Sequence, residues 1–472
     1  MPSPTNACAS ATRIILLLAT FLGAAPASAD PLVLHATQAQ EVRSLQAFQP
    51  GGLAAFYMTG QLADAPHLIW KVTLTESATY RVTVLAKCQA PGVRPRLHLG
   101  AAETTVAADS LPRSWDRLEI GVVALPQGAN VLKLDLLPPE RPVGRVDLQA
   151  LELTKLDHAR TLETRAHDAR ADTSWMRHAG FGVMLHWTRE SAPAQGPTKP
   201  YAQAVEDLDV DTLAEKLRST GAGFVVFTTA HGYQDFPAPL AALDKALPGR
   251  TSRRDLIADL AASLQRKGLR LMLYHNPGTV QDPAWVEASG LNSTDRTRYF
   301  NLWQAMISEA GERYGDKLAG WWFDDGATRL YPQNAPWAAL HRAARSGHSA
   351  RLIGFNSWEL PSVTDWQDFD CGEGLREPRG REGRLQPMGD GVYRSSSRKG
   401  QQATACVTLE NGWLHRDSGQ MPSPPTWTEP SLKDYLTRSR QSGLVPIINL
   451  KVTQEGLLGP ASLHLLRRAA QK

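Results

Sequence analysis

One short segment closes an apolar run with two carboxylates, and its residue types suit chemistry on a sugar. Residues 318–326 read Leu-Ala-Gly-Trp-Trp-Phe-Asp-Asp-Gly. Side chains alternate along a strand, so Trp322 shares one face with Asp324. A sugar ring can stack on the indole while the carboxylate attacks it, and parallel α/β folds hold such groups at the carboxyl ends of strands. Asp325 falls on the other face and is more simply explained as a cap of the next helix.

Polar and aromatic side chains also follow the three strands predicted before this segment. Each of these strands ends in or just before a histidine, with an aromatic residue or a threonine beside it. One histidine on an apolar strand usually belongs to the core, but three at the same end of consecutive strands are not all expected to be structural. The carboxyl ends of parallel strands meet at one rim. The predicted contacts at this rim are His186, Trp187, His231, Tyr274, His275 and Trp322.

The elements that must position these residues alternate between strand and helix patterns. Seven clear strands and a weak one near 365–369 favour a (β/α)8 barrel of the TIM type over an open sheet. No GxGxxG motif follows the first strand and no Walker A motif occurs, so a nucleotide-binding fold has no support. The clear strands are 181–187, 223–229, 269–276, 318–324, 351–356, 405–410 and 444–450; the amphipathic helices include 209–219, 253–267, 294–314, 431–442 and 462–470.

The chain before the barrel has a different pattern and is predicted to form a separate domain. A chain of 472 residues exceeds a single core. Residues 30–156 contain short alternating strands with Pro-Gly punctuation, which is typical of an antiparallel β-sandwich. Their cadence resembles the jelly rolls of carbohydrate-binding modules, and a packing domain without a ligand explains it equally well. A polar helical connector, residues 157–176, leads to the predicted catalytic barrel, residues 177–472.

The N-terminal segment and the net charge limit the predicted location of the protein and the kinds of partner expected for it. Residues 1–29 read as a secretory signal, in which Arg13 precedes an apolar run and Ala-Ser-Ala precedes a cut after Ala29. We therefore expect a secreted or periplasmic protein. The net charge of +4 becomes +3 once Arg13 leaves with the signal. A nearly neutral chain argues against nucleic acid or an anionic membrane as the partner.

The cysteines give little sign of a metal or of a disulfide framework. Once Cys8 leaves with the signal, Cys88, Cys371 and Cys406 remain. In an oxidising compartment, Cys371 and Cys406 could form a disulfide. No CxxC pair and no HExxH motif occurs, so zinc-site spacing is absent and we predict no metal and no cofactor.

Five motifs in sequence resemble the α-L-fucosidases of glycoside hydrolase family twenty-nine. The first two, residues 181–187 and 221–231, resemble F-G-I-F-I-H-W and G-A-K-Y-V-V-L-T-T-K-H of that family. Residues 254–256 and 268–274 resemble R-D-L and G-L-K-F-G-L-Y-Y, and Trp322-Phe-Asp324 matches W-F-D. The resemblance covers roughly 175–470. It implies α-L-fucosidase activity, with Asp324 as the nucleophile and His186 on the fucose hydroxyls.

The resemblance also implies a second carboxylate some fifty residues after the nucleophile. The segment Asp368-Phe-Asp-Cys-Gly-Glu373 occupies that place, so Glu373 is the candidate acid/base, with Glu359 and Asp368 as alternatives. The implied reaction is a retaining double displacement, which needs carboxyls about 5–5.5 Å apart. Asp324 attacks the anomeric carbon while Glu373 protonates the leaving oxygen. Glu373 then deprotonates the incoming water.

Three departures from the family pattern concern sugar specificity. Gly232 stands where the family usually has a second histidine, Pro200-Tyr-Ala-Gln replaces Glu-Trp-Tyr, and residues 403–406 replace a tryptophan–glutamate pair. In the family these positions help to hold the fucose hydroxyls. The sugar removed from an oligosaccharide or glycoconjugate could therefore be L-fucose, L-galactose or another related pyranoside. The sequence does not predict the oligomeric state. The alternatives are a non-catalytic sugar-binding protein and a metal-dependent hydrolase on the same barrel.

Overall fold

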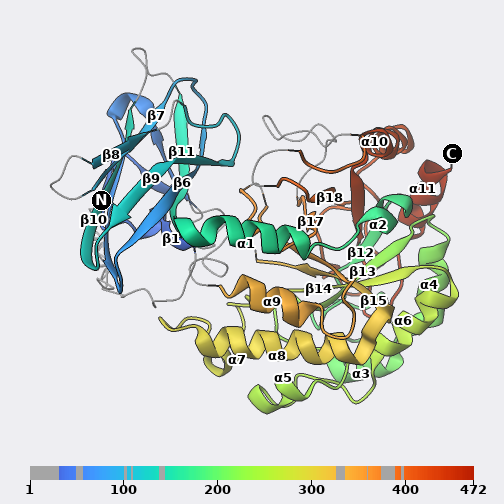
Figure 1. Cartoon of the computed structure of the whole chain (residues 1–472). Coiled ribbons are helices and arrows are strands. Elements are labelled where there is room, and N and C mark those ends of the chain that lie inside the picture. Colours follow the sequence, from blue (N-terminus) through green and yellow to red (C-terminus); the bar gives the residue numbers. More distant parts are fainter. Residues whose placement is uncertain are drawn as a thin grey trace, which may run out of the picture.

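The computed structural model describes most of the chain (Figure 1). The predicted signal, residues 1–29, and the candidate acid Glu359 lie outside the described residues. Among the described residues, no helix combines the length and the apolar character needed to cross a membrane. The described residues are 31–48, 57–99, 104–107, 110–137, 144–325, 335–358, 360–373, 389–394 and 398–471.

The N-terminal part consists of two antiparallel sheets around a shared core. One sheet has the order β3-β4-β11-β6-β9 with β1 also paired to β11, and the other has the order β2-β5-β10-β7-β8. Buried side chains such as Trp70, Val84 and Leu134 fill the space between them. The strands are β1 Leu32–His35, β2 Glu41–Arg43, β3 Gln46–Phe48, β4 Tyr57–Gln61, β5 His67–Leu74, β6 Ala78–Cys88, β7 Arg94–Leu99, β8 Thr104–Ala107, β9 Asp116–Leu125, β10 Gly128–Leu137 and β11 Arg145–Lys155.

Two helices connect the sandwich to the barrel. Helix α1, Leu156–Asp168, packs on β6 and β11, and its Glu163 pairs with Arg81 of β6 at 2.6 Å. The short helix α2, Ser174–His178, precedes the first strand of the barrel. Figure 1 shows α1 running from the sandwich, in blue, towards the barrel.

The C-terminal part is an almost closed parallel barrel of eight strands, which confirms the predicted fold class. The order along the sheet is β16-β15-β14-β13-β12-β19-β18-β17. The weak strand predicted near 365–369 is the two-residue β17. The strands are β12 Gly182–Leu185, β13 Phe224–Ala230, β14 Arg270–His275, β15 Leu318–Phe323, β16 Leu352–Phe355, β17 Phe369–Asp370, β18 Gln402–Thr408 and β19 Val445–Leu450.

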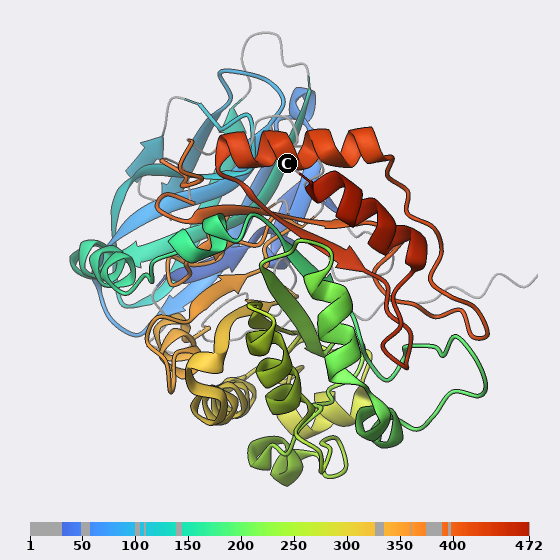
Figure 2. The same ribbon diagram turned by 90° about the vertical axis from the view of Figure 1, so that its right-hand side faces the viewer.

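Helices surround the strands (Figure 2). Their ends follow local signals: Asp209 caps α4 through the amides of Asp211 and Thr212, and α7 and α10 end at left-handed glycines. The five helices named from the sequence are all present. The helices are α3 Tyr201–Asp207, α4 Val210–Arg218, α5 Ala241–Ala246, α6 Leu256–Arg266, α7 Pro283–Ser289, α8 Thr297–Tyr314, α9 Trp337–Ala344, α10 Glu429–Ser442 and α11 Pro460–Ala470.

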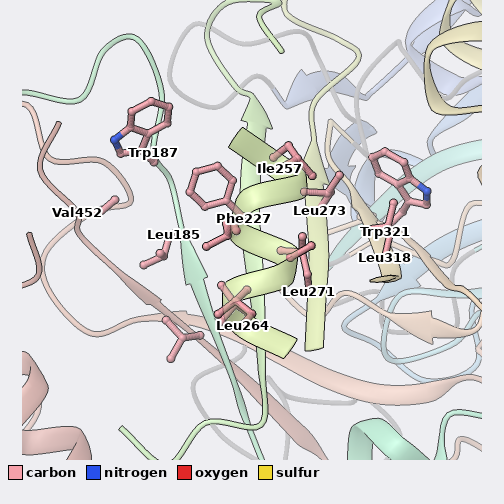
Figure 3. Packing of buried hydrophobic residues seen from close by; sticks show 14 of the residues in the cluster. Leu185, Trp187, Phe227, Ile257, Leu264, Leu271, Leu273, Leu318, Trp321 and Val452 are labelled. Atoms are coloured by element: carbon pink, nitrogen blue, oxygen red, sulfur yellow. The ribbon is translucent and has the colours of Figure 1, made fainter. Parts of the chain in front are cut away.

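Strand alternation divides the barrel into two cores. Leu185, Phe227 and Leu273 point outwards and belong to one core cluster with Ile257 and Leu264 of α6 (Figure 3). A smaller inner cluster, which includes Met184, Val226, Met272, Tyr274 and Trp322, fills the barrel. A residue at the end of a strand therefore faces the mouth of the barrel only if it belongs to the inner set.

The disulfide left open by the sequence does not form. Cys371 and Cys406 are both free and buried, as is Cys88. The thiol of Cys406 instead lies 3.9 Å from the sulfur of Met184 in the inner core.

Candidate active site

Asp324 lies at the mouth of the barrel, directly after β15. Its backbone amide donates to the His275 carbonyl at 3.0 Å and so continues the pairing of β15 with β14. One carboxylate oxygen accepts from Asn356 Nδ2 at 2.8 Å, and the other accepts from the Tyr274 hydroxyl. The Tyr274 ring stacks on Trp322 with centroids 5.2 Å apart. Two donors thus hold the carboxylate beside an aromatic wall.

Glu373 is brought to the same asparagine. Asn356 Nδ2 also donates to a carboxylate oxygen of Glu373. The Asn356 side-chain oxygen accepts from the Trp358 amide at 3.1 Å, which fixes the orientation of the side-chain amide and directs its nitrogen to both acids. Burial, then the charge of Asp324, raises the pKa of Glu373 to about 8, against hydrogen bonds from Asn356 and Trp358.

A glycine turn places Glu373 against the barrel wall. Gly372 has a φ of 63°, and a Cβ there would lie 1.9 Å from the Thr404 carbonyl oxygen. Only glycine tolerates both the left-handed backbone and this approach. The Gly372 carbonyl accepts from the Cys406 amide at 3.0 Å, and Glu373 bridges to Cys406.

Asp368, one alternative acid, has a structural task. It is buried and pairs with Arg345 at 2.7 Å. Its carboxylate also accepts from the amides of Ala171 at 2.8 Å and Ile353 at 2.7 Å, while its own amide donates to the Ile353 carbonyl. These bonds join the two end strands of the sheet, β16 and β17. Burial raises the pKa of Asp368, and Arg345 opposes the shift.

His186 faces the mouth of the barrel with a defined tautomer. Its Nδ1 lies 2.7 Å from the side-chain oxygen of Asn449, whose nitrogen donates to the Trp413 carbonyl at 2.9 Å. An amide oxygen only accepts, so Nδ1 carries the proton and Nε2 is left as an acceptor. Burial lowers the pKa of His186 to about 3, so the ring is neutral. Its ring lies 4.7 Å from Tyr274 and 5.4 Å from Trp413.

His231 lies beside His186, with ring centroids 5.3 Å apart. Its Nδ1 is buried and has no hydrogen-bond partner among the residues that the structure describes. Burial lowers the pKa of His231, and the nearby charges of Asp324 and Glu190 oppose that shift. The indole nitrogen of Trp322 and the hydroxyl of Thr228 are buried without partners in the same described part. Such atoms are free to bond a polar ligand.

Two residues predicted to contact a substrate lie on the helix side of the barrel wall instead. Trp187 is 1% exposed, packs on Phe227, and donates from its indole to the Gln454 carbonyl at 3.0 Å. His275 has both ring nitrogens occupied, Nδ1 by Thr229 at 2.9 Å and Nε2 by Gln234 at 3.1 Å. The polar atoms of both side chains are occupied by protein partners, so neither residue belongs to the site.

Backbone strain concentrates beside the two acids. Among the described residues of the barrel, Asp325 and Trp358 are the non-glycine residues with left-handed backbones, at φ 75° and 50°. Asp325 follows Asp324, and the Trp358 side chain bonds Glu373. The next described helix, α9, has Pro336 at its N-cap position, so Asp325 does not cap it. Strained residues of this kind persist where the surrounding structure holds a functional geometry.

Several residues that complete the site were not predicted from the sequence. Asn356 ends the predicted strand 351–356. Like the histidines, it is a polar residue at the carboxyl end of a parallel strand, and this position was the available signal. Asn449 sits within the last strand, β19, where its polar side chain in an apolar run was the available signal. Trp413 and Arg416 come from the loop after β18, and no local pattern marked them. Within the described residues, no group of three histidine, cysteine, aspartate or glutamate side chains is placed to hold a metal ion.

The fold and the site together define the class of protein. The chain has a TIM-like barrel whose carboxyl rim holds two carboxylates, one of them with a raised pKa, among aromatic rings and neutral histidines. Residues 201–386 match the family model described as Alpha-L-fucosidase. The matched segment carries His231, Tyr274, Asp324 and Glu373, so the match confirms the resemblance to the α-L-fucosidases that was drawn from the motifs.

Individual relatives have low sequence identity to this chain. The chain is 27% identical to the tissue alpha-L-fucosidase of Mus musculus over 148 residues, 25% of this chain and 32% of the relative. The human protein of that name is 26% identical over 141 residues, 23% and 30% of the two chains. The match thus spans about a third of these relatives.

Two solved structures are similar to part of this chain. The alpha-L-fucosidase AlfC from Lactobacillus casei in complex with its α-L-fucose product shows 17% identity, 63% and 96% coverage of the two chains, and a TM-score of 0.46. An alpha-L-fucosidase from Bacteroides thetaiotaomicron shows 16% identity, 64% and 73% coverage, and a TM-score of 0.46.

Proposed function

We propose that this chain is a retaining exo-glycosidase that removes a terminal L-fucose or a related L-pyranoside from an oligosaccharide or glycoconjugate. The observation that carries the proposal is the shared hydrogen bonding of Asp324 and Glu373 to one nitrogen of Asn356. Two oxygens within hydrogen-bond reach of one atom are at most about 6 Å apart. That spacing suits a retaining pair and leaves too little room for the water of an inverting pair, whose carboxyls are about 6.5–9.5 Å apart.

The environments of the two acids support separate roles. Glu373, with its pKa near 8, is protonated at neutral pH and can act as an acid. Asp324 attacks the anomeric carbon as the bond from that carbon to the leaving oxygen breaks, and Glu373 gives its proton to that oxygen. In the second step Glu373 takes a proton from water, the water oxygen bonds to the anomeric carbon, and Asp324 is released.

The remaining inward side chains suit recognition of a sugar. Neutral His186 and His231 offer nitrogens that accept or donate to hydroxyls. Trp322 and Tyr274 present stacked rings for an apolar sugar face, such as the C5-methyl side of a 6-deoxy sugar. We also propose, from the signal pattern alone, that the enzyme acts outside the cytoplasm after a cut behind Ala29.

Hydrolysis of 4-nitrophenyl α-L-fucoside by the wild type and by Asp324→Asn tests this function. The variant keeps the shape of the side chain but removes the nucleophile, so kcat/KM should fall by about 10³-fold or more. Asp325→Asn, in the neighbouring left-handed position that asparagine tolerates, is the matched control and should retain most of the activity.

Each other outcome has a defined meaning. Equal rates for the wild type and Asp324→Asn would remove Asp324 from the nucleophile role. Binding of L-fucose without turnover by the wild type would instead favour a sugar-binding protein on the same barrel.

A further inference from the structure

The space beside Gly232, the residue that follows His231, is filled by the side chain of Glu190. Gly232 does not have a left-handed backbone, so its conformation does not require glycine. A Cβ at Gly232 would lie 2.6 Å from Oε2 of Glu190, closer than real Cβ contacts allow. The carboxylate of Glu190 therefore occupies the room that a side chain at position 232 would take.

Glu190 is held in this place by bonds from the protein, but only on one side. Glu190 comes from the loop after β12, and its backbone amide donates to the Thr188 hydroxyl at 3.1 Å. Oε1 accepts from Arg416 at 3.0 Å. Oε2 is buried and has no hydrogen-bond partner among the described residues. A buried carboxylate oxygen without a donor is costly, so a donor from a ligand would be favoured there.

The Glu190–Arg416 pair lies at the histidine side of the site. Glu190 touches the residue next to His231, and its charge acts to raise the pKa of His231. The charge of Arg416 acts in the opposite direction on both His231 and His186. The charge of Asp324 also acts to raise the pKa of His231, so the Glu190 carboxylate and the candidate nucleophile both lie near this imidazole.

We propose that Glu190 is a specificity-determining residue that accepts a hydrogen bond from one hydroxyl of the bound pyranose, in the space opened by Gly232. This inference rests on the proposed function and deepens it. Arg416 is the positioning residue, because its guanidinium holds Oε1 and turns Oε2 to the ligand. A carboxylate accepts more strongly than an imidazole does, and it cannot donate. The sugar therefore needs a free hydroxyl at the ring position that meets Glu190.

The first test compares variants on 4-nitrophenyl α-L-fucoside and on its 2-, 3- and 4-deoxy analogues. Glu190→Gln should lower kcat/KM on the parent by roughly 10- to 100-fold, the effect of losing a charge-assisted bond. On the deoxy analogue that lacks the partner hydroxyl, Glu190→Gln should have almost no effect. Glu215→Gln, an exposed carboxylate on α4 paired with Lys267, is the control and should change nothing.

The second test moves Glu190 without altering its charge. Gly232→Ala adds a methyl group against the flexible end of the Glu190 side chain, so it should displace the carboxylate and reproduce the loss on the parent substrate. In a Glu190→Ala background the same change should cost little, since nothing is left to displace. Gly389→Ala is the matched control: its nearest atom is 4.0 Å away, at the Gln441 carbonyl near the end of α10.

The results separate this inference from the proposed function. A loss for Glu190→Gln that is equal on the parent and all three analogues would overturn the inference while the glycosidase stands. So would a loss for Gly232→Ala that persists in the Glu190→Ala background. If the wild type hydrolyses none of the substrates, the proposed function fails, and the rise in Tm caused by L-fucose decides instead. A rise lost in Glu190→Gln supports the contact, and no rise in the wild type overturns both.

Discussion

A single side chain, Asn356, connects the two carboxylates on which the proposed chemistry depends. It is fully buried, its backbone amide donates to the Phe323 carbonyl at 2.8 Å, and its side-chain amide is oriented by Trp358. The bond to Glu373 favours the ionised acid, whereas burial and Asp324 favour the protonated one. The balance leaves the Glu373 pKa close to the pH at which a general acid is efficient.

Loss of this amide should shift the pH dependence of the reaction. In the wild type, kcat/KM should fall as pH rises through about 8, because Glu373 loses the proton that it must donate. Asn356→Ala removes a bond to the ionised form, so the alkaline limb should move to higher pH. The maximum should also fall at least about 10-fold, since Asp324 loses a donor. A pH profile on 4-nitrophenyl α-L-fucoside measures both, and an unmoved limb would contradict this account of Asn356.

The same raised pKa predicts that the acid makes the fold less stable at high pH. Below about pH 4 Glu373 is protonated in both the folded and the unfolded chain. As pH rises towards 8, the unfolded chain loses this proton while the folded chain keeps it, so the free energy of unfolding falls. Glu373→Gln is neutral throughout and avoids this loss. Urea unfolding should show the variant more stable by roughly 2–4 kcal/mol at pH 9 and within about 1 kcal/mol of wild type at pH 5.

At the scale of elements, alternation along the strands explains both the successes and the misplacements of the sequence analysis. Seven strands and the five longest helices of the barrel were predictable because each of them carries a clear apolar period. Alternation also separates Tyr274, which faces inwards, from His275, which faces Thr229 and Gln234. The same alternation that separates Asp325 from Asp324 places Trp187 and His275 on the outer face, at the ends of β12 and β14.

Other parts of the site depend on tertiary structure and had no local signal. Glu373 reaches Asn356 through an irregular turn at Gly372, and the fit of that turn against Thr404 of β18 appears only in three dimensions. Glu190 and Gly232 are 42 residues apart in sequence and meet because β12 and β13 are neighbours. No period or motif connects such pairs.

The outward position of Trp187 predicts that its replacement affects stability rather than substrate recognition. Trp187→Phe keeps an aromatic ring against Phe227 but leaves the Gln454 carbonyl without its donor. An unsatisfied buried acceptor should lower the free energy of unfolding by about 1–3 kcal/mol, measured in urea. The KM for 4-nitrophenyl α-L-fucoside should stay unchanged. A large rise in KM at unchanged stability would return Trp187 to the substrate site.

At the scale of the whole molecule, the sandwich contacts the barrel close to the candidate acid. Tyr57 of β4 and Trp115, which precedes β9, form a buried cluster with Leu360 of the barrel, and Trp358 packs against it. The Tyr57 and Trp115 rings lie 4.9 Å apart. Because the Trp358 side chain bonds Glu373, a chain of contacts runs from the N-terminal domain to the acid. The N-terminal domain can thus influence Glu373 through these contacts without binding sugar.

Trp115→Ala tests whether these contacts influence Glu373. Removing the indole leaves Trp358 without part of its support, and a looser bond from Trp358 favours protonated Glu373. The alkaline limb of kcat/KM should therefore move to higher pH. The rate on a natural fucoside, whose poor leaving group needs acid help, should fall more than the rate on the 4-nitrophenyl substrate.

Leu97→Ala, a fully buried change in β7 of the other sheet, is the control for general loosening of the sandwich. It should lower the stability of the N-terminal domain while it leaves the pH profile and the leaving-group dependence in place. If Leu97→Ala shifts the profile as much as Trp115→Ala does, the effect comes from the stability of the domain rather than from the aromatic contact. If neither variant shifts it, the sandwich packs on the barrel without influencing Glu373.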